Sequence, residues 1–290
     1  MKNILLILFP IFLMNCTRQQ VENQSYILHP AVSQKAVLVL FPCFPCDKEH
    51  TAAEADFLRD MDETGITTIL LDYNQKLFLS ESEKLELSQF LNQIFDENKI
   101  EKQNIFIGGF SSGGNLAAMV TNYLLETRNE IQPKGVFIVD APFDLEQLYN
   151  GAKKDLIQNV DVDAVEEAKS LVEFLEKKLG NPAQEIENYM KNSPYLISKN
   201  AAQNISQLTK IKTRFYCEPA LDWQAENRNR VYEDLNAFKL EKAYESLLEL
   251  GGRNVEFIET ENRGIRANGQ RHPHSWNIVA RENLVNWILN

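Results

Sequence analysis

The sequence is poor in histidine and cysteine, and it lacks an excess of positive charge. Each of the two residue types occurs four times among 290 residues, and acidic residues outnumber basic ones by 41 to 30. The net charge of −11 repels phosphate backbones, so we expect no nucleic-acid partner. Cys43 and Cys46 have no second Cys or His pair at zinc-finger spacing, so we predict no metal site. No organic cofactor is implied either.

Hydrophobic runs long enough to span a bilayer are also missing. The apolar run from Ile4 to Met14 is too short to do so and predicts a secretory signal peptide over residues 1–15. Its end, Leu13 to Cys16, resembles the lipobox of bacterial lipoproteins, although Asn15 replaces the usual small residue. The resemblance implies a lipid on Cys16 that anchors the protein to a membrane of the bacterial cell envelope. The alternative is a periplasmic or secreted protein without a lipid.

Removing Cys16 leaves three cysteines, an odd number for a protein that passes through an oxidising compartment. At least one thiol should therefore stay free. Cys43 and Cys46 are expected either to form a local disulfide or to remain two buried thiols.

The composition is that of an ordinary globular chain, with 44% hydrophobic and 24% charged residues. Short, almost entirely apolar runs predict strands that helices cover on both faces. The predicted strands span Ala36 to Phe41, Ile66 to Leu71, Asn104 to Ile107, Gly135 to Val139, Thr213 to Cys217 and Asn254 to Glu259. The predicted helices span roughly Thr51 to Glu63, Ser80 to Glu97, Gly114 to Glu126 and Arg230 to Leu250, and a last helix ends near Trp287. This alternation predicts an α/β fold with a doubly wound, mostly parallel sheet.

Two segments lie outside that alternation. Residues 16–34 are polar and aperiodic, which predicts a tether. From about 141 to 195 the chain favours helix and contains no convincing strand. We therefore predict a helical cap inserted into a domain that spans residues 35–290.

One motif carries most of the functional information. Gly109 to Gly113 reads Gly-Phe-Ser-Ser-Gly between a predicted strand and a predicted helix, the context that G-x-S-x-G requires. The glycines remove side chains that would collide with the sharp turn, so Ser111 projects its hydroxyl above the carboxyl end of the sheet. The amides that follow, beginning with Ser112, are able to hold an oxyanion. A phosphate-binding turn is the alternative, but its lysine is absent.

The residues from Ser111 to Ala117 read SSGGNLA, which resembles the elbow of hormone-sensitive-lipase-like esterases in the α/β-hydrolase superfamily. The order of elements from about residue 35 onward is similar to that of the superfamily as well. The resemblance implies an α/β-hydrolase fold with Ser111 as nucleophile. Ser-x-Gly-Gly also occurs in prolyl-oligopeptidase-type peptidases, so a serine peptidase stays an alternative.

A serine nucleophile needs a base, and the superfamily runs in the order serine, acid, histidine. His272 and His274 are the histidines that follow Ser111 in the chain. We favour His274, because a small residue and an aromatic one follow it at the entry to the last helix, as in the family pattern. His272 is the alternate.

The acid is expected on a loop between the elbow and the histidine. Asp222 is our choice, because Pro219 to Asp222 resembles the G-x-x-D of many relatives, with proline in place of glycine. Glu218 is the main competitor. Asp140 is a weaker one, since a helix cap would also explain it.

A second oxyanion donor follows an early strand in these relatives, where they read His-Gly-Gly. This sequence has two prolines there, which donate no hydrogen bond, so the backbone amide of Cys43 or Phe44 is the expected donor. A disulfide between Cys43 and Cys46 would stiffen the loop.

Together these residues predict a serine hydrolase that cleaves small-molecule carboxylic esters through an acyl-enzyme. A non-catalytic binding lipoprotein on the same fold is an alternative from another class. Arg263, Arg266 and Arg271 lie near the predicted histidine. They either select an acidic substrate or are solvated loop charges.

Overall fold

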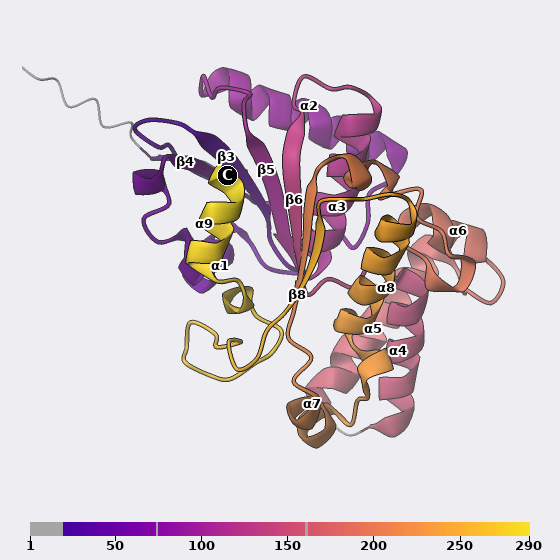
Figure 1. Ribbon diagram of the computed structural model, residues 1–290. Coiled ribbons are helices and arrows are strands. Elements are labelled where there is room, and N and C mark those ends of the chain that lie inside the picture. The colour runs from indigo at the N-terminus through magenta and orange to yellow at the C-terminus, as the bar shows by residue number, and fades with distance from the viewer. Residues whose placement is uncertain (1–19, 74, 160–161) are drawn as a thin grey trace, which may run out of the picture.

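The computed structural model describes residues 20–73, 75–159 and 162–290. Within these residues an eight-stranded sheet in the order β1-β2-β4-β3-β5-β6-β7-β8 passes through the middle of the molecule (Figure 1). Strands β3 to β8 pair in parallel, whereas β1 and β2 are antiparallel. The strands are β1 (Val21–Glu22), β2 (Tyr26–His29), β3 (Ala36–Phe41), β4 (Ile66–Leu71), β5 (Ile105–Phe110), β6 (Pro133–Val139), β7 (Lys212–Cys217) and β8 (Val255–Glu259). The predicted doubly wound, mostly parallel sheet is confirmed.

Helices cover both faces of this sheet (Figure 1). They are α1 (Lys48–Glu54), α2 (Glu81–Glu97), α3 (Ser112–Glu126), α4 (Leu145–Gln158), α5 (Val162–Leu179), α6 (Ile186–Asn192), α7 (Leu221–Arg228), α8 (Asn236–Glu249) and α9 (Arg281–Leu289). Side chains of β3 alternate between two cores, as a strand buried on both faces requires. Val37 and Val39 join the core under α2, α3 and α8, whereas Leu38 and Leu40 join the core under α9.

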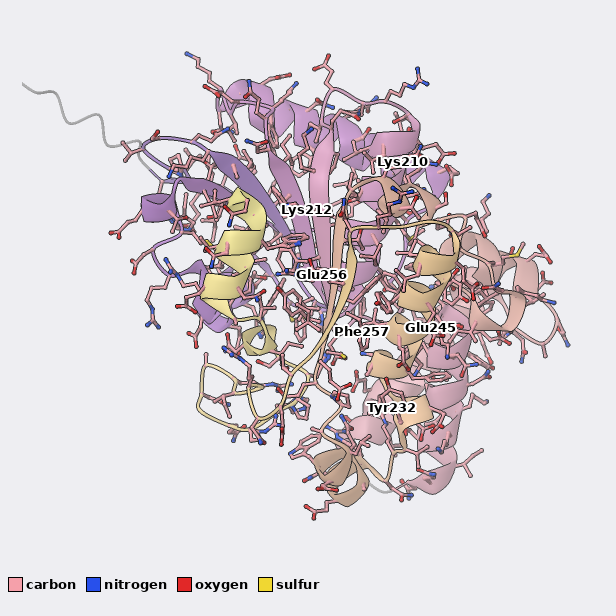
Figure 2. All side chains as sticks on the ribbon, in the orientation of Figure 1. Lys210, Lys212, Tyr232, Glu245, Glu256 and Phe257 are labelled. Carbon is pink, nitrogen blue, oxygen red and sulfur yellow. A yellow bond between two sulfur atoms is a disulfide. The ribbon has the colours of Figure 1, made fainter. Side chains whose placement is uncertain are left out.

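The same alternation is visible on β8. Phe257 packs against Tyr244 of α8, with ring centroids 5.7 Å apart. Glu256 faces the other side of the sheet, where its carboxylate accepts a hydrogen bond from Arg214 at 2.7 Å (Figure 2).

The predicted tether is wrong for the described residues from 20 onward. Tyr26–His29 forms β2, which pairs with β4 so that Tyr26 lies opposite Leu71. The three apolar residues of β2 are buried, and this burial, rather than any periodicity, makes the segment part of the sheet. The predicted signal peptide and Cys16 lie outside the described residues.

The predicted first helix is also too long and begins too late. The Asp47 side chain accepts a hydrogen bond from the backbone amide of His50 and caps α1, which ends at Glu54. Two short 3₁₀ turns follow, Asp56–Leu58 and Asp62–Thr64.

The segment predicted as a cap contains α4, α5 and α6, between β6 and β7. These helices have their own core, in which Leu145, Leu175 and Tyr189 are fully buried. No helix among the described residues is long and apolar enough to cross a membrane.

Candidate active site

Ser111 lies between β5 and α3, at the strand-to-helix turn predicted for it. Its backbone has φ 55° and ψ −129°, a conformation that costs a non-glycine residue about 1–3 kcal/mol. The Ser111 amide donates to the carbonyl of Val139 at 2.9 Å, and the amide of Gly114 donates to the carbonyl of Ser111 at 2.9 Å. These bonds hold the strained turn between two neighbouring strands and the first turn of the helix.

The first glycine of the motif is required by the turn itself, and the second by contacts that the sequence does not reveal. A Cβ on Gly109 would lie 2.0 Å from the carbonyl oxygen of Gly113. A Cβ on Gly113 would lie 2.3 Å from the carbonyl oxygen of Pro42 and 2.5 Å from that of Phe41. The elbow is therefore packed against the end of β3 and the loop that follows it.

Gly113→Ala is expected to destabilise the protein by about 1–3 kcal/mol, because the added methyl group meets backbone atoms that cannot rotate away. Urea unfolding measures the effect. Gly151→Ala is the matched control: its Cβ meets nothing within 4 Å, and in α4 alanine should stabilise by about 0.5–1 kcal/mol. Equal behaviour of the two variants would contradict the prediction.

His274 lies beside the elbow and bonds to Asp140. The distance from its Nδ1 to Oδ2 of Asp140 is 2.5 Å, and its ring centroid lies 4.4 Å from that of Phe110. Because the carboxylate accepts, Nδ1 carries the hydrogen and Nε2 keeps its lone pair. Asp140 directly follows Val139, whose carbonyl binds the Ser111 amide. Ser111, Asp140 and His274 are thus gathered at the carboxyl edge of β5 and β6.

This contact corrects the assignment of Asp222. Asp222 is exposed in the first turn of α7 and has no hydrogen bond with His274, although the structure describes both residues. The physical reason is the path of the loop that carries His274, which brings the imidazole to the end of β6 and not to α7. Asp140, the weaker candidate from sequence, occupies that place.

Neighbouring polar groups fix Asp140 in turn. Its amide donates to the carbonyl of Tyr216 at 2.9 Å, and the side-chain amide of Asn236 donates to the Asp140 carbonyl at 2.9 Å. The fully buried Asn115 donates to the carbonyl of Pro142 at 3.0 Å. Sequence reasoning missed both asparagines, although Asn115 lies within the elbow motif itself.

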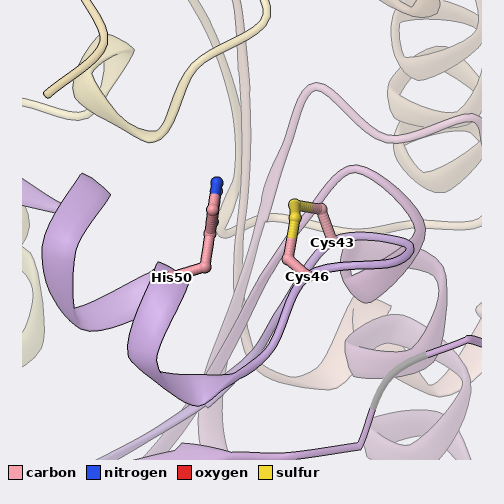
Figure 3. A group of neighbouring side chains, drawn as sticks. All are labelled: Cys43, Cys46 and His50. Atoms are coloured by element: carbon pink, nitrogen blue, oxygen red, sulfur yellow. A yellow bond between two sulfur atoms is a disulfide. The ribbon is translucent and has the colours of Figure 1, made fainter. Parts of the chain in front are cut away.

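The loop after β3 is closed by a disulfide between Cys43 and Cys46, one of the two predicted states, with Cα atoms 5.0 Å apart (Figure 3). His50 lies beside it, but disulfide sulfurs are not the thiolates that bind metal. Cys217 is the free cysteine among the described residues, and burial raises its pKa, which keeps the thiol protonated.

This loop faces the elbow through Pro42 and helix α5 through Phe44. The Phe44 ring is 42% exposed, and its centroid lies 6.0 Å from that of Phe174 in α5. The backbone amides of Cys43, Phe44 and Ser112 donate no hydrogen bond to any part of the chain that the structure describes. All three predicted oxyanion donors are therefore available to donate a hydrogen bond to a ligand.

A hollow of about 750 Å³ lies elsewhere. It is formed where β6 and β7 begin, at the amino edge of the sheet, with Lys210 and Lys212 in its wall (Figure 2). Ser111 follows the carboxyl end of β5, at the opposite edge. The hollow therefore belongs to a different part of the molecule from the residues described above.

No protein-family model matches the chain, and no curated protein sequence matches it. Solved structures do match. MPT51 of Mycobacterium tuberculosis has a TM-score of 0.56 and 13% identity over 93% of this chain and 95% of its own. An esterase from the bacterial hormone-sensitive lipase family has a TM-score of 0.55 and 11% identity over 91% and 77%. EstE5 has a TM-score of 0.54 and 12% identity over 93% and 83%. The chain has the α/β-hydrolase fold.

Among α/β-hydrolases of known structure, those similar to this chain include esterases and lipases. An identity of 11 to 13% establishes the fold and not the reaction. The arrangement of side chains has to supply the argument for function.

His272, the alternate base, occupies a different place from His274 in this fold. Its Nδ1 lies 3.1 Å from the carbonyl oxygen of His274, which can only accept, so Nδ1 carries the hydrogen. Its ring packs on Trp223 at 5.1 Å. Burial lowers the pKa of His272 to about 4, and the positive charge of Arg266 acts in the same direction. His272 is therefore a neutral support of the loop at neutral pH.

The lowered pKa of His272 predicts a pH dependence of stability. The pKa of His272 is about 4 in the folded protein and has its ordinary value of 6.5 in the unfolded chain, so the unfolded chain binds more protons between these two pH values. The contribution of His272 to the free energy of unfolding is therefore complete above pH 6.5 and is lost toward pH 4. We expect the difference in unfolding free energy between wild type and His272→Gln to shrink from about pH 7 to about pH 5. Urea unfolding measures it, and groups common to both proteins cancel. A constant difference would argue against the lowered pKa.

Glu218, the other competitor for the acid, is buried at the end of β7. Its carboxylate accepts hydrogen bonds from the backbone amides of Arg263 and Gly264 and not from His274. Three arginines were offered from sequence as selectors of an acidic substrate or as solvated loop charges. Of these, Arg271 forms an ion pair with Glu218, whereas Arg263 is exposed.

Proposed function

We propose that this protein is a serine hydrolase that cleaves carboxylic esters through an acyl-enzyme. The observation that carries the proposal is the bond from His274 Nδ1 to Asp140 beside the strained Ser111 elbow. It directs the free Nε2 lone pair away from the carboxylate and leaves it available as a base.

In this reaction the Ser111 oxygen bonds to the ester carbonyl carbon while its proton passes to Nε2 of His274. Asp140 stabilises the imidazolium that forms. The amide of Ser112, together with that of Cys43 or Phe44, holds the oxyanion. Collapse of the intermediate breaks the bond to the alcohol, which takes the proton from His274. A water molecule then attacks the acyl carbon while its proton passes to His274. The bond to the Ser111 oxygen breaks, Ser111 takes the proton back, and the carboxylic acid product is released.

The choice of esters rests on the fold and its neighbours. The hormone-sensitive-lipase-family structure is described as an esterase, and crystals of EstE5 were soaked with p-nitrophenyl butyrate. A p-nitrophenyl ester of short chain length is therefore the first substrate to try.

A fluorophosphonate probe tests the activated serine, and peptide mass mapping locates the adduct. We expect the adduct on Ser111, with turnover of p-nitrophenyl butyrate far above that of an aminoacyl p-nitroanilide. Faster cleavage of the anilide would point to a peptidase instead. A folded protein that forms no adduct would reject the hydrolase and favour the binding-protein alternative.

A further inference from the structure

The loop that carries His274 has little regular structure of its own. It runs from Thr260, after β8, to Ser275, and we call it the histidine loop. Residues in such a loop hold a catalytic geometry only if other contacts fix the backbone. A buried side chain that supplies several of these contacts is Glu218.

One oxygen of Glu218 gathers the start of the histidine loop. Oε2 accepts hydrogen bonds from the amide of Arg263 at 2.9 Å, the amide of Gly264 at 3.0 Å and the hydroxyl of Thr260 at 3.1 Å. The side chain is 1% exposed, so these bonds replace the water that a carboxylate would otherwise bind.

The other oxygen holds the end of the loop. Oε1 forms an ion pair with the guanidinium of Arg271, which also donates to the carbonyl of Gly264 at 3.0 Å. The amide of His272 donates to the same carbonyl at 2.8 Å. Both arms of the loop therefore meet at Glu218, and Arg271 lies three residues before His274.

Packing leaves this junction little freedom. A Cβ on Gly264 would lie 2.4 Å from the carbonyl oxygen of His272. The two arms are thus in contact, and a change in the length or charge of the Glu218 side chain has to move one arm relative to the other.

We propose that Glu218 is a positioning residue, a buried carboxylate that folds the histidine loop so that His274 reaches Asp140 and Ser111. The inference rests on the proposed function for its kinetic consequences. The division of roles is chemical: Asp140 bonds to the imidazole, whereas Glu218, within the part of the chain that the structure describes, bonds to backbone amides, Thr260 and Arg271. Two carboxylates that follow neighbouring strands thus act on one histidine, one directly and one through the loop.

Glu218→Gln tests the proposal in the full chain with p-nitrophenyl butyrate as substrate. The amide keeps the size of the side chain but removes the charge that pairs with Arg271. We expect kcat to fall on the order of 100-fold with KM unchanged, because the imidazole is displaced while the substrate site is not. Glu256→Gln is the matched control, since it removes the Arg214 ion pair from β8 without touching the histidine loop. It should retain wild-type kcat.

Two further measurements keep the test decisive. Arg271→Gln removes the same ion pair from the other side. Because the two residues are partners in one contact, kcat of the variant that carries both substitutions should be no lower than that of either single variant. Proton NMR of the His274 Nδ1–H requires no activity: its signal should weaken through faster exchange in Glu218→Gln and persist in Glu256→Gln. If Glu218→Gln does not fold, Arg271→Gln carries both readouts.

The outcomes separate the two proposals. A Glu218→Gln protein with wild-type kcat and an unchanged Nδ1–H signal overturns the positioning role. A loss as large as that of Asp140→Asn with the Nδ1–H signal intact also overturns it, because Glu218 would then act on the reaction directly. If the wild type itself neither hydrolyses esters nor forms the serine adduct, the proposed function fails, and the NMR comparison alone decides the role of Glu218.

Discussion

Asp140→Asn is expected to lower kcat by about 10⁴-fold, while Asp222→Asn leaves it near the wild-type value. Asparagine has the shape of aspartate, so the backbone contacts of Asp140 with Tyr216 and Asn236 should persist. What disappears is the negative charge 2.5 Å from His274 Nδ1. Without it the imidazolium is no longer stabilised, and an amide that donates to Nδ1 places the hydrogen on Nε2, where the base is needed.

Steady-state turnover of p-nitrophenyl butyrate and the rate of fluorophosphonate labelling measure this loss. Asp222→Asn is the matched control, because it makes the same chemical change on the exposed first turn of α7. If Asp222→Asn were the inactive variant and Asp140→Asn the active one, the pairing in the structure would not be the functional one. Circular dichroism of both variants checks that the fold is retained.

The sequence was sufficient for the parts of the fold that depend on local patterns. The mostly apolar runs Ala36–Phe41 and Ile66–Leu71 match β3 and β4 at both ends, because strands buried on both faces consist largely of hydrophobic residues. The elbow was found because its glycines have a local steric cause. Chain order and the small number of histidines left His272 and His274, and a resemblance to the family pattern favoured His274, which the structure places beside Phe110.

The acid could not be chosen in the same way. Asp140 and Glu218 each follow directly the last residue of a buried strand, and Asp222 lies four residues beyond Glu218. Which of them meets the imidazole depends on how the histidine loop folds, and that is decided by contacts between residues more than forty positions apart, such as Glu218 and Gly264. A resemblance to G-x-x-D favoured Asp222 without information on that loop. Strand β2 was missed for a related reason, since its partner β4 lies far along the chain.

His274→Gln is expected to reduce turnover by about 10⁴-fold or more, because the variant lacks a group that can take the Ser111 proton. Glutamine can still donate to Asp140, so the loop should keep its place. His272→Gln is the matched control two residues away. His272 faces Trp223 and the His274 carbonyl, and its pKa of about 4 means that it neither gains nor releases a proton near neutral pH. We expect at most about a tenfold loss from it, as for a loop support.

The comparison of these two variants decides which imidazole belongs to the serine. Turnover and labelling measured at several pH values add a second criterion, since a base acts only in its neutral form. A base with a pKa of about 4, as in His272, would keep full activity down to about pH 5. Activity that persists at pH 5 and disappears in His272→Gln would transfer the role to His272, and the bond between His274 and Asp140 would then serve only to hold the loop.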